Sequence, residues 1–316
     1  MKKAFVLLVF TVLGFGFAQT CDDGFRLFTH LEGETCVPDT PQRIVTLQDQ
    51  NALLPLLELG VVPVGSAGLV TEDGYEYRAT QGYDTSAVTF VGSYWPGPDV
   101  ETVATLEPDL IVANPYIEDA LDTYSKIAPT VIMDVIEQPM DDALFQFAEL
   151  VGKTERAEEL QAAFQAEAAE LRAQLGNKLE TTTISIVEYW DGIIYGVPSK
   201  QSLSLALPEL GLVRTEYEQT IEDWVELSPE LLGDNPADIA VLIAIPASQV
   251  GSEDTAFAEF LANPVVQVTD VGKAGQIFAV HPDAVYGVSW GRATDAMREF
   301  AAILMQDDLN RDLVQE

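Results

Sequence analysis

The stretch that organises the chain lies almost at its midpoint and reads TERAEELQAAFQAEAAELRAQLG, from Thr154 to Gly176. Its apolar residues recur at spacings of three and four, which predicts one helix with a single apolar face. Thr154 is the expected N-cap, and Gly176 is the expected left-handed residue after the last turn. At 1.5 Å per residue, roughly 21 helical residues span about 32 Å, the width of a small domain. The helix therefore either covers a single α/β domain or connects two lobes, and the flanking sequence decides which.

The first 18 residues have the pattern of a secretory signal peptide. Two lysines precede an apolar run of roughly 14 residues, and Gly16-Phe17-Ala18 places small residues at positions −3 and −1 of a cleavage site. We expect cleavage after Ala18, because the run is too short to span the roughly 30 Å of hydrocarbon in a membrane. A lipid anchor on Cys21 is the alternative, although Thr20 is a poor residue before a lipidated cysteine. The mature chain is predicted to be a soluble exported protein of the periplasm or cell envelope.

The two cysteines, Cys21 and Cys36, predict a disulfide. They lie fifteen positions apart, and an exported chain folds in an oxidising compartment. Residues 25–30 and 35–37 have the composition of strands and flank a turn at 31–34, so the bridge would staple an N-terminal hairpin within residues 19–40. Closing such a loop contributes roughly 3 kcal/mol in the chain-entropy model. No Cys-x-x-Cys spacing or histidine cluster indicates a metal site instead.

The composition is strongly acidic. Asp and Glu number 51 against 16 Lys and Arg, and cleavage after Ala18 removes two lysines and no acid, which takes the net charge from −35 to −37. Such a surface repels polyanions and anionic bilayers, so nucleic acid is excluded as a partner. Adaptation to salt is a further explanation of the acidity. With 47% hydrophobic residues, the chain is too apolar for disorder, and about 298 mature residues predict two lobes.

The sequence before the long helix predicts one α/β lobe, at residues 41–139. Residues 41–47 are rich in β-branched side chains, residues 51–60 read as a helix closed by Gly60, and residues 61–65 read as a second strand. Strand, helix and strand with short connections predict a parallel βαβ unit. The other elements expected in this lobe are strands at 88–91, 109–113 and 129–134, a short helix at 101–106 and a helix fragment at 124–127.

The sequence after the helix repeats this organisation in residues 177–316. The elements expected there are strands at 183–188, 238–244 and 276–280 and a helix at 203–211. Leu57-Glu-Leu-Gly-Val61 is echoed by Pro208-Glu-Leu-Gly-Leu212, which indicates a loose duplication of architecture and not a repeat array. We therefore predict an α/β fold of two Rossmann-like lobes with mostly parallel sheets, joined through residues 140–176 by one long interdomain helix.

Five phrases of the sequence carry a resemblance to a known family. They are Pro41-Gln-Arg-Ile-Val, Leu59-Gly-Val-Val-Pro-Val-Gly, Pro98-Asp-Val-Glu-Thr-Val-Ala-Thr-Leu-Glu-Pro-Asp-Leu-Ile, Ile127-Ala-Pro-Thr-Val and Leu227-Ser-Pro-Glu-Leu-Leu. In this order, around a midpoint helix and behind a signal peptide, the chain resembles the iron-siderophore and vitamin B12 group of periplasmic substrate-binding proteins. Those proteins feed ABC importers, and the resemblance covers nearly all of residues 37–305.

The resemblance implies a monomer that holds a ferric siderophore or similar iron chelate between two lobes of restricted relative motion. It implies delivery of that chelate to the membrane permease subunits of an ABC importer, without catalysis and without a cofactor. The N-terminal hairpin with its cysteine pair is similar to members that bind ferric citrate-type ligands. Many of those members carry an arginine in the loop before Pro-x-x-Glu, where this chain has Tyr94-Trp95. This difference favours a neutral or aromatic chelate over a small anionic one.

The candidate ligand-binding residues follow from the expected strand ends. Ligands of open parallel sheets lie beyond the carboxyl ends of the strands, and aromatic or arginine side chains in loops broken by Pro and Gly are suited to hold them. Core packing is the simpler explanation for each aromatic residue taken alone. The candidates are Gln48, Arg78, Trp95, Tyr116, Tyr189, Trp190, Trp290 and Arg292.

Two glutamates are candidates for permease docking. In the family that the chain resembles, one glutamate on each lobe pairs with permease arginines, and the matching positions here are Glu101 and Glu230. Each follows a proline-containing entry into a short helix, where a carboxylate is held near the positive end of the helix dipole. A glutamate is favoured in any first helical turn, so one such residue alone does not indicate docking. The prediction of a docking role depends on finding two of them, one in each lobe.

Other functions remain as alternatives. The sequence contains no Gly-x-Ser-x-Gly elbow, phosphate loop, Gly-x-Gly-x-x-Gly or His-Glu-x-x-His motif, which argues against an exported enzyme. His281-Pro-Asp283 offers two metal ligands, fewer than the three or four of a closed metal site, so no direct metal binding is expected. A haem-binding protein with a tyrosine or His281 as axial ligand, or a cobalamin-binding protein of the same importer type, is the alternative within this class.

Overall fold

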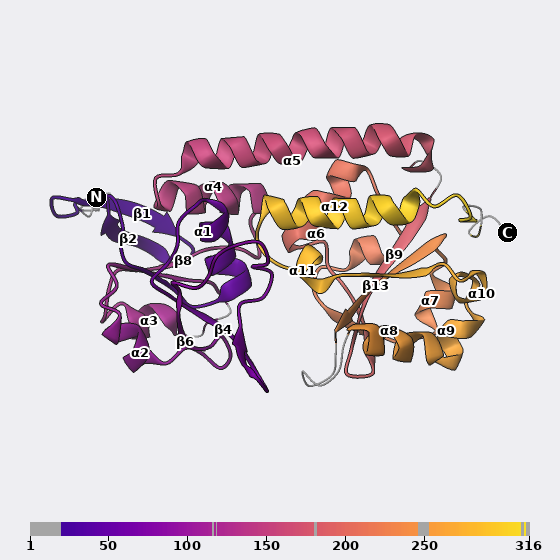
Figure 1. The fold of residues 1–316 in the computed structure, drawn as a ribbon, viewed down its shortest axis with the longest axis horizontal. Coiled ribbons are helices and arrows are strands. Elements are labelled where there is room, and N and C mark those ends of the chain that lie inside the picture. The colour runs from indigo at the N-terminus through magenta and orange to yellow at the C-terminus, as the bar shows by residue number, and fades with distance from the viewer. Residues whose placement is uncertain are drawn as a thin grey trace, which may run out of the picture.

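The computed structural model describes residues 20–115, 117, 119–179, 182–245, 253–310 and 313. Figure 1 shows two α/β lobes side by side, with helix α5 (Thr154–Leu175) lying along one side of both. The two-lobe α/β fold with mostly parallel sheets and a long helix is therefore confirmed. The predicted signal peptide at residues 1–18 lies outside the described residues, and so does Tyr116.

The N-terminal lobe is built on a six-stranded sheet. Five parallel strands lie in the order β6-β4-β3-β7-β8, and β5 pairs antiparallel with β4. In chain order this is 3-2-1-4-5, the Rossmann arrangement, with its switch point between β3 and β7. The strands are β3 (Ile44–Thr46), β4 (Gly65–Thr71), β5 (Gly74–Glu76), β6 (Thr89–Ser93), β7 (Leu110–Ala113) and β8 (Thr130–Ile132); the helices are η1 (Asp49–Leu53), α1 (Leu54–Glu58), α2 (Val100–Thr105) and α3 (Ala120–Tyr124).

Two predictions in this lobe are wrong in position. The strand expected at residues 61–65 begins at Gly65, because Val61 still closes the preceding helix: Val61 N donates to Leu56 O. Gly60 follows the helix as predicted, with a positive φ of 78°. The helix fragment expected at 124–127 instead ends at Tyr124, and a hydrogen bond from Ile127 N to Tyr124 O forms a turn after it.

The C-terminal lobe repeats the parallel architecture. Strands β11, β9, β13 and β14 are parallel, while β10 pairs antiparallel with β9 and β12 with β10. Nearly every residue of β13 is buried, as expected for a parallel sheet that is covered on both faces. The strands are β9 (Thr183–Trp190), β10 (Ile193–Gly196), β11 (Val213–Arg214), β12 (Val225–Leu227), β13 (Ile239–Ile245) and β14 (Ile277–Val280). The helices are η2 (Gly176–Leu179), α6 (Gln201–Leu210), η3 (Glu218–Thr220), α7 (Leu231–Asp234), α8 (Glu253–Ala262), α9 (Pro264–Val268), α10 (Asp270–Ala274) and α11 (Pro282–Val285).

Helix α5 has the predicted length and apolar face. Its buried residues are Ala157, Phe164, Ala168, Leu171 and Leu175, the stripe given by the spacing of three and four. The predicted capping by Thr154 is wrong: the helix begins one residue earlier than a threonine cap requires, so Lys153 occupies the N-cap and makes no side-chain capping bond. Gly176 ends the helix with φ of 57°, the positive angle that glycine was expected to supply.

A second helix joins the lobes beside α5. Helix α12 (Trp290–Leu304) lies along α5 and α6, and α4 (Met140–Leu150) lies under α5 at the other end (Figure 1). One continuous hydrophobic core runs beneath these helices, from Ile44 in the first sheet to Ile239 in the second. The lobes are therefore held by two helices over a shared core, and not by α5 alone.

The start of α12 is fixed to the N-terminal lobe by Glu58 of α1. The Glu58 carboxylate accepts hydrogen bonds from Gly291 N at 2.7 Å and from Trp290 N at 3.1 Å, where the first amides of the helix lack internal partners. Burial raises the pKa of Glu58 to about 6, against the opposing effect of these amides. The Trp290 indole donates to Asp141 of α4 at 2.6 Å and packs edge-on against Phe145.

Candidate functional site

A cleft of about 1280 Å³ lies between the lobes. Its walls are formed where the parallel strands of both sheets end: Gln48 follows β3, Ile245 ends β13 and His281 follows β14. The carboxyl ends of parallel strands are where open α/β sheets bind ligands. The cleft therefore combines the ligand-binding edges of two sheets in one cavity.

The N-terminal wall of the cleft contains an ordered guanidinium. Arg78 reaches Asp49 through two hydrogen bonds, Nη2 to Oδ1 at 2.6 Å and Nε to Oδ2 at 2.9 Å, and its guanidinium lies 4.0 Å from the centre of the Tyr94 ring. Asp49 is fully buried, so this pair holds Arg78 in one orientation. Beside it Gln48 caps the following helix by accepting from Asn51 N at 2.5 Å. These side chains present amide and guanidinium donors to the cleft.

The C-terminal wall is aromatic and acidic. Glu188 and Trp190 of β9 both line the cleft, because residues two apart in a strand face the same side. The Tyr286 hydroxyl donates to the Glu188 carboxylate, and the Trp224 ring lies 6.3 Å from the Tyr286 ring. Burial raises the pKa of Glu188, while its hydrogen bonds from Tyr286 and Trp224 oppose the rise. Trp190 is 48% exposed, an uncovered aromatic surface in the cavity.

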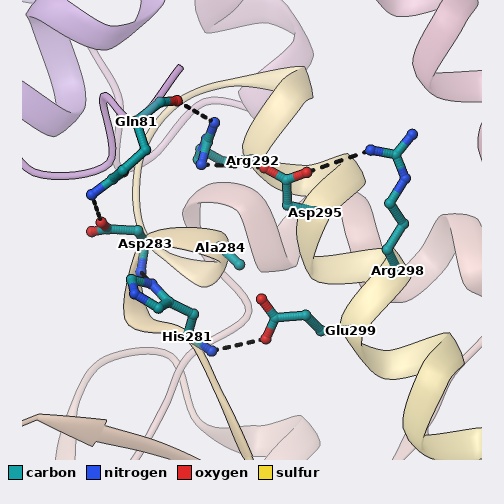
Figure 2. Close-up of a pocket in the computed structure, with 8 residues that line it drawn as sticks. All are labelled: Gln81, His281, Asp283, Ala284, Arg292, Asp295, Arg298 and Glu299. Carbon is teal, nitrogen blue, oxygen red and sulfur yellow. Dashed lines mark hydrogen bonds and ion pairs between the residues drawn. The ribbon is translucent and has the colours of Figure 1, made fainter. Parts of the chain in front are cut away.

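The rim of the cleft is a smaller pocket of about 330 Å³ that joins the lobes (Figure 2). Gln81 of the N-terminal lobe donates to the Asp283 carboxylate, and its carbonyl accepts from Arg292 Nη2 at 3.0 Å. Arg292 also pairs with Asp295 at 3.2 Å. His281 Nδ1 accepts from Asp283 N, and its Nε2 lies 3.4 Å from Glu253 Oε1, so both ring nitrogens have protein partners. This engagement does not favour the hypothesis of an axial haem ligand at His281.

The predicted ligand residues separate into two groups. Gln48, Arg78 and Trp190 line the cleft, and their contact with a ligand stays a prediction. The other four described candidates do not line it: Trp95, Tyr189, Trp290 and Arg292. The eighth candidate, Tyr116, lies outside the described residues.

The four described candidates that do not line the cleft lie in other surroundings. Tyr189 alternates with Glu188 and Trp190 along β9, so it faces away from the cleft and packs on Phe260 of α8. Trp290 is 1% exposed and is held as part of the helix anchor described above, which corrects its prediction as a ligand residue. Arg292 lies in the rim pocket, where it binds Gln81 and Asp295. Trp95 follows Tyr94 but is 63% exposed on the loop.

Several cleft residues were missed from the sequence. They are Glu76, Glu188, Gln201, Trp224 and Glu253. Glutamates carry no signal in a chain with 51 acidic residues, and Trp224 stands before a short strand that the sequence pattern did not predict. Glu188 could have been found, because it ends the predicted strand and lies two residues before the candidate Trp190, so a continued strand places both on one face.

The predicted docking glutamates both lie at the start of a short helix, one in each lobe. Glu101 is exposed in the first turn of α2, where Asp99 caps the helix by accepting from Thr102 N at 2.6 Å. Glu230 is exposed immediately before α7, and Ser228 donates to its carboxylate. In Figure 1, α2 and α7 lie in opposite lobes on the side that faces away from α5.

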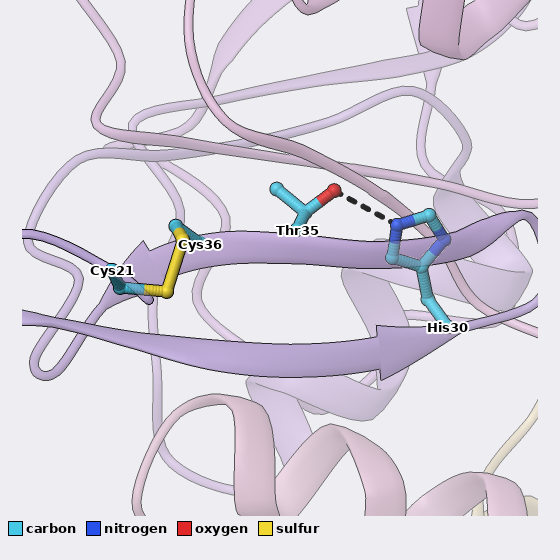
Figure 3. The surroundings of a disulfide bond; sticks show 4 residues. All are labelled: Cys21, His30, Thr35 and Cys36. Carbon is cyan, nitrogen blue, oxygen red and sulfur yellow. Dashed lines mark hydrogen bonds between the residues drawn. A yellow bond between two sulfur atoms is a disulfide. The ribbon is translucent and has the colours of Figure 1, made fainter. Parts of the chain in front are cut away.

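The N-terminal hairpin lies outside the cleft. Strands β1 (Phe25–His30) and β2 (Gly33–Pro38) pair antiparallel, and Cys21 is bonded to Cys36 as predicted (Figure 3). Leu31 N donates to Ile132 O, which attaches the hairpin to the edge of the first sheet. Burial lowers the pKa of His30, whose Nε2 lies 2.9 Å from the Thr35 hydroxyl. The bridge therefore stabilises an attachment to the lobe and not the cavity.

Two absences among the described residues bear on the site. Within those residues, no cluster of three or more His, Cys, Asp or Glu side chains could hold a metal ion. In the same part of the chain, no helix has the length and apolar character needed to span a membrane.

Comparisons with known proteins agree with this geometry. The sequence pattern of the periplasmic binding protein family matches residues 46–284. The chain is 31% identical over 182 residues to the probable siderophore-binding lipoprotein YfiY of Bacillus subtilis, covering 57% of this chain and 54% of YfiY, about half the relative's length. It is 25% identical over 269 residues to the ferric-anguibactin-binding protein FatB of Vibrio anguillarum, covering 81% of this chain and 80% of FatB. The structure of Staphylococcus aureus SirA complexed with staphyloferrin B superposes with a TM-score of 0.72 at 22% identity, covering 90% of this chain and 99% of SirA, and shows the shared fold.

Proposed function

Because the chain belongs to the periplasmic binding protein family, whose members are binding proteins and not enzymes, we propose that it binds a ferric siderophore or a similar iron chelate and delivers it to an ABC importer. YfiY and FatB, whose names describe siderophore and ferric-siderophore binding, support this ligand class. The protein needs no cofactor of its own, since the iron arrives within the chelate.

The observation that carries the proposal is the cavity at the strand ends of both lobes. Its volume of about 1280 Å³ exceeds the usual range of small-ligand sites, roughly 300 to 1,000 Å³, and suits a bulky chelate. An amide, a fixed guanidinium and an uncovered tryptophan face this cavity from opposite walls. The amide and the guanidinium can donate hydrogen bonds to the oxygens of a chelate, and the tryptophan can cover the apolar parts of the chelate. These groups do not form the pair of nucleophile and base that covalent catalysis needs.

A titration followed by tryptophan emission tests the proposal. A panel of ferric hydroxamate, catecholate and carboxylate chelates, haem and cobalamin is added to the purified protein, and saturable quenching by a ferric chelate is expected. Trp190→Ala should weaken that binding about tenfold or more, since it removes an aromatic wall of the cleft. Trp95→Ala is the matched control, because this exposed tryptophan does not line the cleft. Saturation by haem or cobalamin alone, with no ferric chelate bound, would replace this function with the alternative ligand class.

The permease contact belongs to the same proposal. Glu101 and Glu230 present one exposed carboxylate from each lobe, as a permease of two subunits with one contact per lobe requires. Ion pairs at the rim of an interface mainly fix orientation and speed encounter. We propose that these two glutamates dock the loaded protein on the permease as a monomer.

The protein acts in the cell envelope. YfiY is named a lipoprotein and the family is periplasmic, which supports an exported location. The finer proposal is export through a signal peptide cleaved after Ala18, which leaves the disulfide to form in an oxidising compartment. Mass spectrometry of the protein purified from the envelope tests it: a chain beginning at Gln19 is expected, and lipidated Cys21 would overturn it.

A further inference from the structure

The C-terminal wall of the cleft carries negative charge without a matching cation. Four carboxylates line it, from Glu188, Glu253, Asp254 and Asp283, and among the described residues of this wall none is a lysine or an arginine. His281 is the one histidine at the described cleft, and it already contacts Glu253.

The N-terminal wall does not offset this charge. Arg78 is the sole lysine or arginine among the described residues that line the main cavity, and its charge is matched by the fully buried Asp49. Arg292 and Arg298 lie in the rim pocket, where they already pair with Asp295 and Glu167. Glu76 adds a fifth carboxylate to the cavity. Burial raises the pKa of Glu76, and Asp283 on the opposite lobe raises it further. Burial also raises the pKa of Glu253; His281 opposes this rise, while Asp283 and Asp254 add to it. Carboxylates from both lobes therefore lie near enough to one another in this cavity to disfavour each other's charged form.

Aromatic side chains stand beside the carboxylates of the C-terminal wall. Trp190 exposes about half of its surface. The Tyr286 hydroxyl donates a hydrogen bond to Glu188, and the Trp224 ring lies beside the Tyr286 ring. Aromatic faces combined with carboxylates form a favourable environment for an organic ammonium group, by cation–π attraction and by charge. The opposite wall, with Arg78 and Gln48, supplies donors for anionic oxygens.

We propose that the ligand is a ferric chelate without net negative charge, bearing an ammonium arm that lies against the C-terminal wall while its iron-binding oxygens face Arg78. This inference rests on the proposed function. Each hydroxamate contributes one negative charge, so three of them neutralise Fe³⁺, whereas three catecholates leave three negative charges. The cleft thus selects tris-hydroxamate chemistry with a cationic substituent and rejects tris-catecholate and carboxylate-rich chelates.

The test uses one ferric core with three different charges. Ferrioxamine B carries a free ammonium, its N-acetyl derivative is neutral, and its N-succinyl derivative carries a carboxylate. Titration at low ionic strength should give affinities in that order, with a loss on the order of tenfold for each step of charge. The differences should shrink in 0.5 M salt, because screening weakens the interaction between the arm and the wall.

Variants test whether the carboxylates of the C-terminal wall cause the affinity difference among the three chelates. Glu253→Gln combined with Asp254→Asn should narrow the affinity spread across the three chelates, and Glu158→Gln, on the exposed face of α5, should leave it unchanged. Equal affinities for the three, or tightest binding of the succinylated chelate or of a tris-catecholate, overturn the charge inference while leaving the proposed function intact. Failure of every ferric chelate to bind overturns both. The comparison of three ligands on the unaltered protein does not depend on any variant folding.

Discussion

Replacement of Glu58 by glutamine tests how the two lobes are held together. The wild-type carboxylate caps the start of α12 from the opposite lobe, at 2.7 and 3.1 Å from two amides, and is almost fully buried. Burial raises its pKa from an ordinary 4.5 to about 6. The folded chain therefore binds this proton more tightly than the unfolded chain. Stability contributed by the protonated form is fully present below about pH 4.5 and is lost as the pH rises through about 6.

The expected size follows from the same pKa. A rise from 4.5 to about 6 corresponds to about 2 kcal/mol of unfolding free energy, lost between pH 4.5 and pH 7.5. Glutamine keeps an oxygen that can accept one amide and has no proton to lose. The unfolding free energy of Glu58→Gln relative to wild type should therefore increase by about 2 kcal/mol over this range, whatever the offset between the two proteins at pH 4.5.

Urea unfolding at pH 4.5, 5.5, 6.5 and 7.5 measures this difference. The other carboxylates titrate in both proteins, so their contribution cancels in the comparison. Glu158→Gln, an exposed change on α5, is the matched control and should follow the wild-type curve. Parallel curves for wild type and Glu58→Gln would refute the assignment of a buried, protonation-sensitive anchor at the start of α12.

Three further predictions concern separate parts of the molecule. Arg78→Ala leaves the fully buried Asp49 carboxylate without its cation and should lower the unfolding free energy by about 3 kcal/mol. Arg156→Ala, which breaks an exposed ion pair, should lower the unfolding free energy by less than about 1 kcal/mol. Equal losses for the two variants in urea unfolding would contradict the importance of the buried pair. Reduction of the hairpin disulfide should lower stability by roughly 3 kcal/mol and leave chelate affinity unchanged, and two reactive thiols in unreduced protein would rule the bridge out. Glu101→Ala combined with Glu230→Ala should abolish uptake while ligand affinity stays at the wild-type value, and normal transport by this double variant would place docking on another surface.

The features predicted correctly from the sequence are those that local chemistry determines. The long helix has its apolar stripe and its terminal glycine within 23 residues, and the hairpin has its strands, turn and cysteines within 20. The second connection between the lobes could not be found this way. It depends on hydrogen bonds between Glu58 and the start of α12, more than 230 positions away, and no local pattern distinguishes that glutamate from the others.

The candidate site was only partly predictable for a related reason. The predicted strand ended at Glu188, so Tyr189 and Trp190 were both placed beyond its end, whereas β9 continues to Trp190 and its pleat sends these two side chains to opposite sides. Trp290 was assigned to a loop because Gly287 precedes it and Gly291 follows, but Ser289 caps a helix there by accepting from Arg292 N. Gln48 and Arg78 were correctly placed at the cleft, since the end of the first strand and the aromatic loop after it are both marked in the sequence.

The position of iron in the loaded protein shows whether the cleft binds a ferric chelate. Crystals grown with a saturating ferric chelate, measured at the iron absorption edge, locate the metal without assumptions about the ligand. We expect one anomalous peak inside the cleft, between Arg78 on one wall and Trp190 on the other, with the metal bound by the chelate and by no protein atom. Iron bound directly by protein side chains, or found only outside the cleft, would contradict it.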